Sequence, residues 1–350
     1  MEMNKKHGEK LDLTKYISTK KEFNEGCFPK FLLEIDGEIY IFKMNKTEQE
    51  EDGDFTYYQD IVEVFCSKFF KAVGINNFVE YQLAKCGDDE GCVCKSFNEQ
   101  GVQSLNLRSL LALNFYNEKD KKVYPISQQF DVDTFWKDWG NQDNLETAKK
   151  TMWGEQYLNS VNSLIYEIKK FSQTYNFNFD ESEIRKELKE MVVLDFFMWN
   201  RDRNLENITF LMDKDNNITL APLYDHGFNF GLDFFKRNVN PEDIGFCFYL
   251  GLSDIGRYHG FWESKWLKMG GLVALDIYEL SKKDDHIKTL VQKIKSCDFE
   301  KIFNEMETEN GILIDKDIKS TIQNFFDSRV QKYDNTIRKL NKKINQNIEK

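Results

Sequence analysis

The hydrophobic period of the chain changes near residue 100, and no other feature limits the fold as strongly. Before that point, short apolar runs rich in β-branched and aromatic residues alternate with turn-forming residues, as in β-strands. After it, apolar side chains recur mainly at helical spacing. We therefore expect an α+β protein with two lobes. The N-lobe, residues 1–97, should be β-rich with one main helix, and the larger C-lobe, residues 98–350, should be mainly helical.

The first elements of the N-lobe are a hairpin and a helix. Residues 31–35 and 38–43 are β-rich runs around a tight Asp36-Gly37 turn, which is a hairpin signature. Apolar residues then recur at helical spacing over residues 57–73, so that this segment is predicted to be a helix.

The rest of the N-lobe is expected to contain a loop and two further strands. The acidic stretch 48–54 reads as a loop before the helix, and Gly74 is a natural helix stop. Residues 78–84 and 92–97 form a second predicted strand pair, around a turn at residues 87–91.

Three helices stand out in the C-lobe. One has its apolar stripe over residues 152–171, and another covers residues 318–348. Between them, Asp180 with Glu183 resembles a capping box, and the helix that it starts runs to Trp199. The second half of this helix is apolar nearly all round, so we expect it to be buried.

Charge and cysteine content exclude several classes of protein. With 48 Lys and Arg against 59 Asp and Glu, the net charge is −11, so we expect no nucleic-acid partner. The basic residues of 316–350 are interpreted as the solvated face of the last helix. The seven cysteines are expected to be free thiols. Because the N-terminus is polar and no apolar run could span a membrane, we expect a cytoplasmic protein, with export as an effector left open.

The segment after the buried helix carries the most chemical information. A polar loop holds Asp202 and Asn207, and a predicted hairpin over residues 208–224 then delivers Asp225 close to Asn207. An amide oxygen and a carboxylate that converge in this way can hold Mg²⁺ on a nucleotide phosphate. Asp202 can accept a proton from an attacking hydroxyl, and its spacing from Asn207 is that of a protein-kinase catalytic loop.

Simpler interpretations of these residues exist. Asp and Asn are ordinary loop residues, and this spacing often occurs by chance. A calcium loop over residues 213–224 fails, because Ile218 and Tyr224 stand where Gly and Glu are needed. A zinc site at Cys86, Cys92 and Cys94 fits no common ligand spacing.

The N-lobe supplies the expected complement. Lys43 ends an apolar strand, although a buried Lys needs a partner. Glu63 lies at the edge of the apolar stripe of the following helix, so it could reach Lys43. Taken alone, Lys43 is more simply interpreted as a lysine at a strand end whose ammonium group extends to solvent.

Together these segments resemble the HipA-like serine/threonine protein kinases, and most closely their compact, CtkA-like type. The resemblance covers the hairpin that ends in Lys43, the helix segment 63–75 and the strand 92–97. It is strongest in residues 200–207 and 220–225.

The resemblance implies a bilobal protein-kinase-like fold that binds ATP between its lobes and autophosphorylates. It implies that Lys43 contacts the phosphates, that Glu63 is its ion-pair partner and that Asp202 is the catalytic base.

The same resemblance implies the cofactor sites. Asn207 and Asp225 would hold Mg²⁺, and Gly26 and Lys30 would belong to a loop over the ATP phosphates. The hinge between the lobes would follow Phe97.

Two departures from the family pattern keep other hypotheses open. Asn204 stands where the family loop usually has His, and Gly26 is the single glycine of the phosphate loop, residues 24–30. A kinase acting on a protein of unknown identity is the first hypothesis. A nucleotide-binding pseudokinase or partner module is the second, and a lipid or small-molecule kinase is the third. The resemblance also allows for an antitoxin-like protein regulator.

Overall fold

The computed structural model of the chain describes most of both predicted lobes. The described residues are 8–22, 29–45, 47–50, 53–98, 101–131, 158–200, 202–203, 205–234 and 277–348, together with 134, 135, 138 and 274. Met152, Trp153 and Tyr157 of the predicted helical stripe lie outside this part of the chain.

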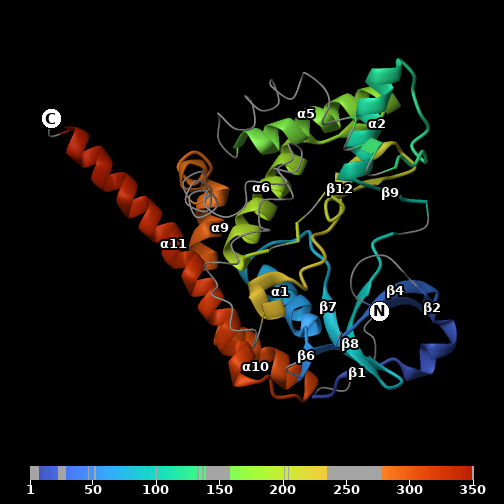
Figure 1. Cartoon of the computed structure of the whole chain (residues 1–350), viewed down its shortest axis with the longest axis vertical. Helices are drawn as coiled ribbons and strands as arrows, with labels where there is room; N and C mark the ends of the chain where they lie inside the picture. The colour runs from blue at the N-terminus through green and yellow to red at the C-terminus, as the bar shows by residue number, and fades with distance from the viewer. Residues whose placement is uncertain are drawn as a thin grey trace.

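A six-stranded sheet forms the N-terminal lobe, in the order β1-β7-β8-β4-β3-β2 (Figure 1). The strands are β1 (Leu11–Asp12), β2 (Lys21–Glu22), β3 (Lys30–Ile35), β4 (Glu38–Met44), β7 (Tyr81–Cys86) and β8 (Asp89–Lys95). Neighbours are antiparallel except β1 and β7, which are parallel. A 3-10 helix, η1 (Thr14–Thr19), connects β1 to β2.

The predicted hairpin around Asp36 and Gly37 is confirmed as β3 and β4. Both turn residues have positive φ, 52° and 82°. That backbone matches the twist of the two strands, and Gly and Asp tolerate it better than most residues.

The acidic stretch 48–54, expected to be a loop, instead contributes to a small hairpin. Strand β5 (Thr47–Glu50) pairs with β6 (Gly53–Thr56). The hydroxyls of Thr47 and Thr56 lie 3.1 Å apart at its open end. The prediction was wrong because strand pairing is made by main-chain groups, which acidic side chains do not remove.

The turn between β7 and β8 is tighter than predicted. The strands reach Cys86 and Asp89, so that Gly87 and Asp88 form the turn and Gly91 lies inside β8. A Cβ on Gly91 would lie 2.0 Å from the main-chain oxygen of Lys43. Gly91 is therefore required for close approach of β8 to β4, and not for the turn.

Helix α1 (Gln59–Val73) packs its apolar stripe against the sheet and ends at Gly74, as predicted. Gly74 has a φ of 86°, and its amide donates to the carbonyl of Phe70 at 3.0 Å. This left-handed cap closes the helix with a residue that adopts the conformation without strain.

The C-terminal lobe consists of helices around a four-stranded sheet, whose order is β10-β12-β11-β9. The strands are β9 (Gln103–Asn106), β10 (Asn178–Phe179), β11 (Thr209–Met212) and β12 (Asn217–Leu220). The helices are α2 (Leu107–Asp120), α5 (Leu158–Tyr175), α6 (Glu181–Met198), η2 (Asn229–Phe234), α9 (Asp285–Lys295), α10 (Phe299–Asn310) and α11 (Lys316–Ile348). The predicted hairpin over residues 208–224 is β11 and β12, with shorter strands than expected.

Helix α6 begins and is buried as the sequence indicates. The carboxylate of Asp180 accepts hydrogen bonds from the amides of Ser182 and Glu183, at 2.8 and 3.1 Å. From Met191 to Met198 every side chain is buried.

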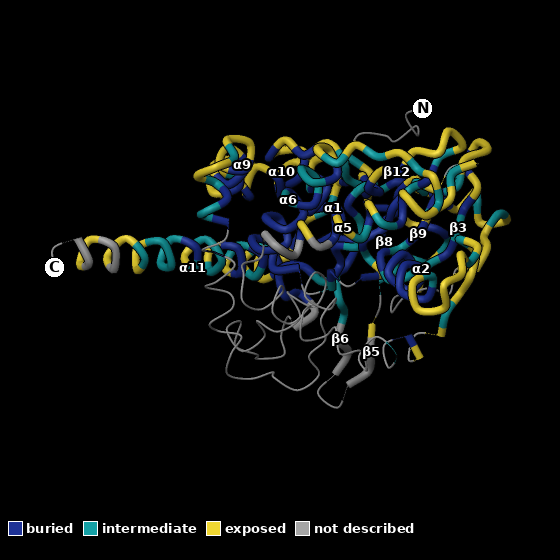
Figure 2. The backbone as a smooth tube through the Cα atoms, turned by 90° about the horizontal axis from the view of Figure 1, so that it is seen from above, coloured by how far each residue is buried: buried dark blue, intermediate teal, exposed yellow. Residues whose placement is uncertain are grey.

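One hydrophobic core joins the two lobes, from α1 and the sheet through α6 to α9, α10 and α11. Helices α10 and α11 lie beside α1, and the C-terminal part of α11 projects from the body (Figures 1 and 2). The protein thus has the predicted α+β architecture, while a division at residue 97 stays a prediction. No described helix combines the length and the apolar character that crossing a membrane requires.

Candidate active site

Lys43 lies in the middle of three strands at the inner face of the N-terminal lobe. In the sheet register it stands between Lys30 of β3 and Cys92 of β8. Only 6% of Lys43 is exposed, and its Nζ lies 5.1 Å from the centre of the Tyr81 ring. A buried ammonium group needs anionic partners, and Lys43 has two.

These partners come from different lobes. Glu63 of α1 forms the predicted ion pair with Lys43 through its Oε1. Asp225, which follows β12, accepts from Lys43 Nζ through its Oδ1 at 2.7 Å. The second oxygen of Glu63 accepts from the amide of His226 at 2.9 Å. Glu63 thus links α1 both to Lys43 and to the segment that carries Asp225.

The charges of this cluster favour the ionised forms of Lys43 and Asp225. Burial alone would lower the pKa of Lys43, but the carboxylates of Asp225 and Glu63 outweigh it and hold that pKa well above its usual value. Partial burial works against the Asp225 carboxylate, yet Lys43 lowers the pKa of Asp225 to about 2. Burial raises the pKa of Glu63, and the contact with Lys43 opposes that rise.

The loop with Asp202 begins where α6 ends. Trp199 caps α6 in the left-handed region, with a φ of 53°. The side chain of the fully buried Asn200 donates to Asp195 at 2.8 Å and accepts from the amide of Asp202 at 2.9 Å. Asn207 Nδ2 in turn donates to Asp202, to its carbonyl at 2.6 Å and to its carboxylate at 3.2 Å. The two predicted site residues of this loop are therefore brought together.

Arg203, which the sequence analysis missed, connects three segments of the C-terminal lobe that build the site. It is 2% exposed, and its Nε and Nη2 donate to the two oxygens of Asp195 at 3.0 and 3.2 Å. Its Nη1 donates to the carbonyls of Asn207 and Tyr224, at 3.0 and 3.2 Å. One guanidinium group therefore joins α6 to the main chain of Asn207 and to the main chain of Tyr224, the residue before Asp225. The available signal was Asp195, an acidic residue within an otherwise apolar half-helix that needs a buried cation.

Contacts between the lobes place Asp225. Leu223 exchanges main-chain hydrogen bonds with Asn77 and Val79 of the N-terminal lobe, at 3.0 and 2.9 Å. Asp225 then adopts a φ of 61°, which turns the chain toward α1. His226 is 1% exposed and packs edge-on against Phe70, with ring centres 4.8 Å apart. Burial holds the pKa of His226 well below its usual value, so that the ring is neutral.

The donor set fits Mg²⁺. Asp225 offers a carboxylate on a side chain that is 31% exposed, and Asn207 offers a side-chain amide oxygen. Arg203 bonds to the carbonyls of both Asn207 and Tyr224, and so links the main chains next to the two ligands. Mg²⁺ commonly takes one or two protein oxygens and completes its shell with phosphate and water, so two such ligands suffice.

Other predicted features are only partly described. Lys30 lies in β3 directly across from Lys43. Gly26 and Asn204 lie outside the described residues. The cysteines weighed as zinc ligands, Cys86, Cys92 and Cys94, are buried free thiols in β7 and β8.

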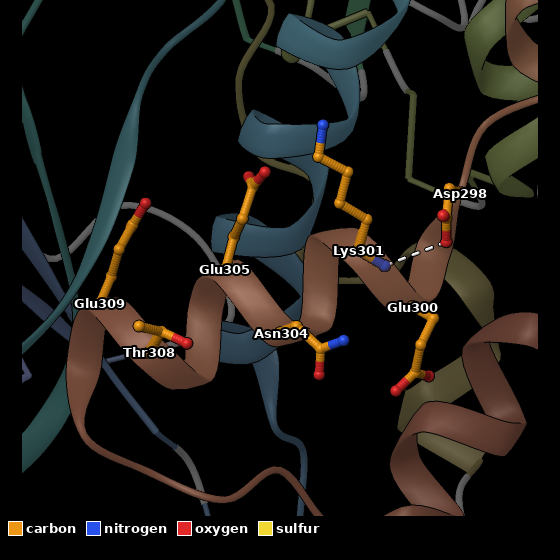
Figure 3. A pocket seen from close by; sticks show the side chains of 7 residues that line it. All are labelled: Asp298, Glu300, Lys301, Asn304, Glu305, Thr308 and Glu309. Carbon is orange, nitrogen blue, oxygen red and sulfur yellow. Dashed lines mark hydrogen bonds between the residues drawn. The ribbon is translucent and has the colours of Figure 1, made fainter.

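Two surface hollows lie away from this cluster. One, of about 500 Å³, follows the outer side of α10, where Lys301 and Glu305 point toward α1 (Figure 3). The other, of about 490 Å³, lies between α1, α9 and α10. Neither is lined by Lys43, Asp202 or Asp225, and both are open to solvent.

Comparison with known proteins identifies the fold. No family model and no curated protein matches the chain. Among solved structures, the proinflammatory kinase CtkA of Helicobacter pylori matches with a TM-score of 0.50 and 14% identity, over 94% of this chain and 99% of that one. HipA of Shewanella oneidensis, solved with HipB and operator DNA, matches with a TM-score of 0.39 and 11% identity. That alignment covers 89% of this chain and 64% of HipA. The similarity to CtkA shows that the chain has a kinase-like fold over nearly its whole length.

Proposed function

We propose that the protein is an ATP- and Mg²⁺-dependent phosphotransferase that acts on Ser or Thr of a protein, itself included. The observation that carries the proposal is the charged cluster of Lys43, Glu63 and Asp225 beside the loop of Asp202 and Asn207. These residue types at these positions are the ones that a protein kinase uses for phosphates, metal and proton transfer. The kinase-like fold supports the same assignment.

Each side chain has a separate task in the proposed reaction. Lys43 contacts the ATP phosphates, and Glu63 holds its ammonium group in place. Asn207 and Asp225 hold Mg²⁺, which when bound neutralises charge on the phosphates. Asp202 orients the attacking hydroxyl and accepts its proton. The hydroxyl oxygen forms a bond to the γ-phosphorus as the bond to the bridging oxygen breaks, and ADP leaves.

The proposal implies that the contact between Lys43 and Asp225 opens when nucleotide binds. Because Asp225 is to hold the metal and Lys43 the phosphates, nucleotide binding should insert anionic and cationic groups between them. Their 2.7 Å contact then describes the resting state of the site, in which each charge neutralises the other.

Incubation of the protein with labelled ATP and Mg²⁺, followed by mass spectrometry, tests the proposal. We expect phosphoserine or phosphothreonine on the protein or on an added protein substrate. Label transfer only to a lipid or small molecule would favour the third hypothesis. Tight ATP binding without transfer to any acceptor would favour a pseudokinase, which the Asn204 departure motivates.

A further inference from the structure

We propose that Phe325, in the buried part of α11, is a positioning residue that sets the spacing between the loop of Asp202 and the segment of Asp225. Its ring lies between Trp199, which precedes that loop, and Gly231, which follows that segment. The catalytic meaning of this spacing rests on the proposed function, whereas the spacing itself does not.

The first contact is an aromatic stack. The rings of Trp199 and Phe325 have centres 4.5 Å apart and planes inclined by 29°. Trp199 is 2% exposed and is the left-handed cap of α6. Asn200, the next residue, holds the amide of Asp202. The face of Phe325 thus supports the point where the catalytic loop begins.

The second contact is with main chain. A Cβ on Gly231 would lie 2.5 Å from Cζ of Phe325, closer than real Cβ contacts come. Gly231 has a φ of 63° and belongs to η2, six residues after Asp225. The amide of Asn229 donates to the carbonyl of His226 at 3.0 Å, which joins η2 to the Asp225 segment. The ring of Phe325 therefore limits how closely η2 can approach α11.

The backbone that carries Phe325 is itself fixed. Arg329, one turn later, donates from Nε to the carbonyl of Phe196 at 3.0 Å, and its guanidinium lies 4.2 Å from the Phe196 ring. Phe326, the next residue, packs against Phe299 of α10 with ring centres 4.4 Å apart. Figure 1 shows α11 passing both α6 and α1. A ring on such a rigid helix acts as a spacer because neither its backbone nor its neighbours can shift freely.

The two proposed metal ligands belong to the two segments that Phe325 contacts. Asn207 belongs to the loop that begins at Trp199, and Asp225 to the segment that continues to Gly231. A smaller side chain at position 325 should loosen the two segments relative to each other. The expected effect is on metal affinity more than on the affinity for nucleotide alone.

Phe325→Leu tests the inference against Phe171→Leu as a matched control. Phe171 is fully buried in α5 and packs against Tyr175 and Phe177, away from both segments. Both variants should lose stability. Only Phe325→Leu should raise the Mg²⁺ concentration for half-maximal transfer, by roughly 10- to 100-fold, as changes in outer-shell support of metal ligands do. Phe325→Met, which keeps most of the volume, replaces Phe325→Leu if the latter does not fold.

A second readout needs no activity. The amides of Asp202 and His226 are hydrogen-bonded, to Asn200 and Glu63, and should exchange slowly with solvent. Phe325→Leu should accelerate exchange at both amides, and Phe171→Leu at neither. Equal exchange and equal Mg²⁺ dependence in the two variants would overturn the spacer role. A wild type without transfer would instead refute the proposed function, and the exchange rates would still decide whether Phe325 is the spacer.

Discussion

At the scale of single residues, the charged cluster of the site is separate from Asp202, which we propose takes the proton. Lys43, Glu63 and Asp225 form one charged cluster, whereas Asp202 lies on the neighbouring loop and is held by Asn200 and Asn207. Substitutions at Asp202 and Asp225 should therefore have different effects.

Asp202→Ala should reduce phosphoryl transfer by roughly 10²- to 10⁴-fold, the usual contribution of a positioned base, with little change in nucleotide affinity. Asp225→Ala should weaken Mg²⁺-dependent nucleotide binding and transfer together, because the metal acts in both. Binding isotherms and transfer rates measure these effects, with Asp215→Ala in the exposed β11–β12 turn as control. Transfer that persists unchanged in Asp202→Ala would refute the assignment of the base.

Arg203→Ala should lower the free energy of unfolding by about 3–5 kcal/mol, because it leaves the Asp195 carboxylate buried without its cation. The control is Arg185→Ala, which removes a partly exposed pair with Glu181 on the same helix and should change stability far less. Urea unfolding measures both. Similar losses in the two variants would contradict the role of Arg203 as the buried connection of the site.

Lys43 and Arg203 show what sequence reasoning reaches at this scale. A Lys on an apolar strand followed by a Glu at the edge of a helix stripe was sufficient to predict their pairing. Arg203 stands in a polar loop, where an arginine is ordinarily solvated. The turn at Trp199 and the β11–β12 hairpin bring its partners Asp195 and Tyr224 to it. That these segments meet at Arg203 cannot be predicted from the spacing of nearby residues.

At the scale of elements, α6 contacts the N-terminal lobe through its first half and leads into the loop of Asp202 at its end. Its buried half leads into the loop of Asp202, while Glu187 in its first half accepts from Asn77 at 2.7 Å. Asn77 also donates to the carbonyl of Leu220 in β12, at 3.2 Å. A partly buried carboxylate at this junction should make stability depend on pH.

Partial burial raises the pKa of Glu187 from 4.5 to about 7. Between these values the folded state binds a proton that the unfolded state has released, so that stability falls as pH rises from 4.5 to about 7. Glu187→Gln keeps an acceptor for Asn77 and removes this cost. It should stabilise the protein by roughly 1–2 kcal/mol at about pH 8, after allowance for solvent screening, and by nothing near pH 4.5.

Urea unfolding of wild type and Glu187→Gln across this pH range measures the difference. Glu183→Gln, one turn earlier and exposed, is the control on the same helix. A stability difference that does not grow with pH would show that Glu187 is not held in the protonated form by its surroundings.

Elements were predicted correctly where the hydrophobic pattern agreed with a turn, stop or cap residue. The hairpin at Asp36, the stop at Gly74 and the cap at Asp180 each combine a period with a residue that the backbone requires. It failed at residues 48–54, where acidic composition was read as a loop. It also misplaced Gly91, because sequence alone does not distinguish a turn glycine from one that permits close approach of strands.

At the scale of the whole molecule, α1 is packed between the sheet and the C-terminal helices. Phe65 and Phe69 of α1 pack against Phe299 of α10, with ring centres 4.9 and 5.6 Å apart. The sequence predicted the long last helix. It did not predict that the C-terminal helices would contact α1, because contacts between distant segments depend on the closed fold.

The central claim is that the site of Lys43 and Asp225 binds ATP with Mg²⁺, and a thermal melt tests it most directly. With nucleotide at about 100 times its dissociation constant, the folded state should gain about 2.7 kcal/mol, seen as a higher melting temperature. The additional effect of Mg²⁺ should largely disappear in Asp225→Ala. A melting curve that saturating ATP leaves unchanged, both with and without Mg²⁺, would contradict the kinase and the nucleotide-binding pseudokinase alike.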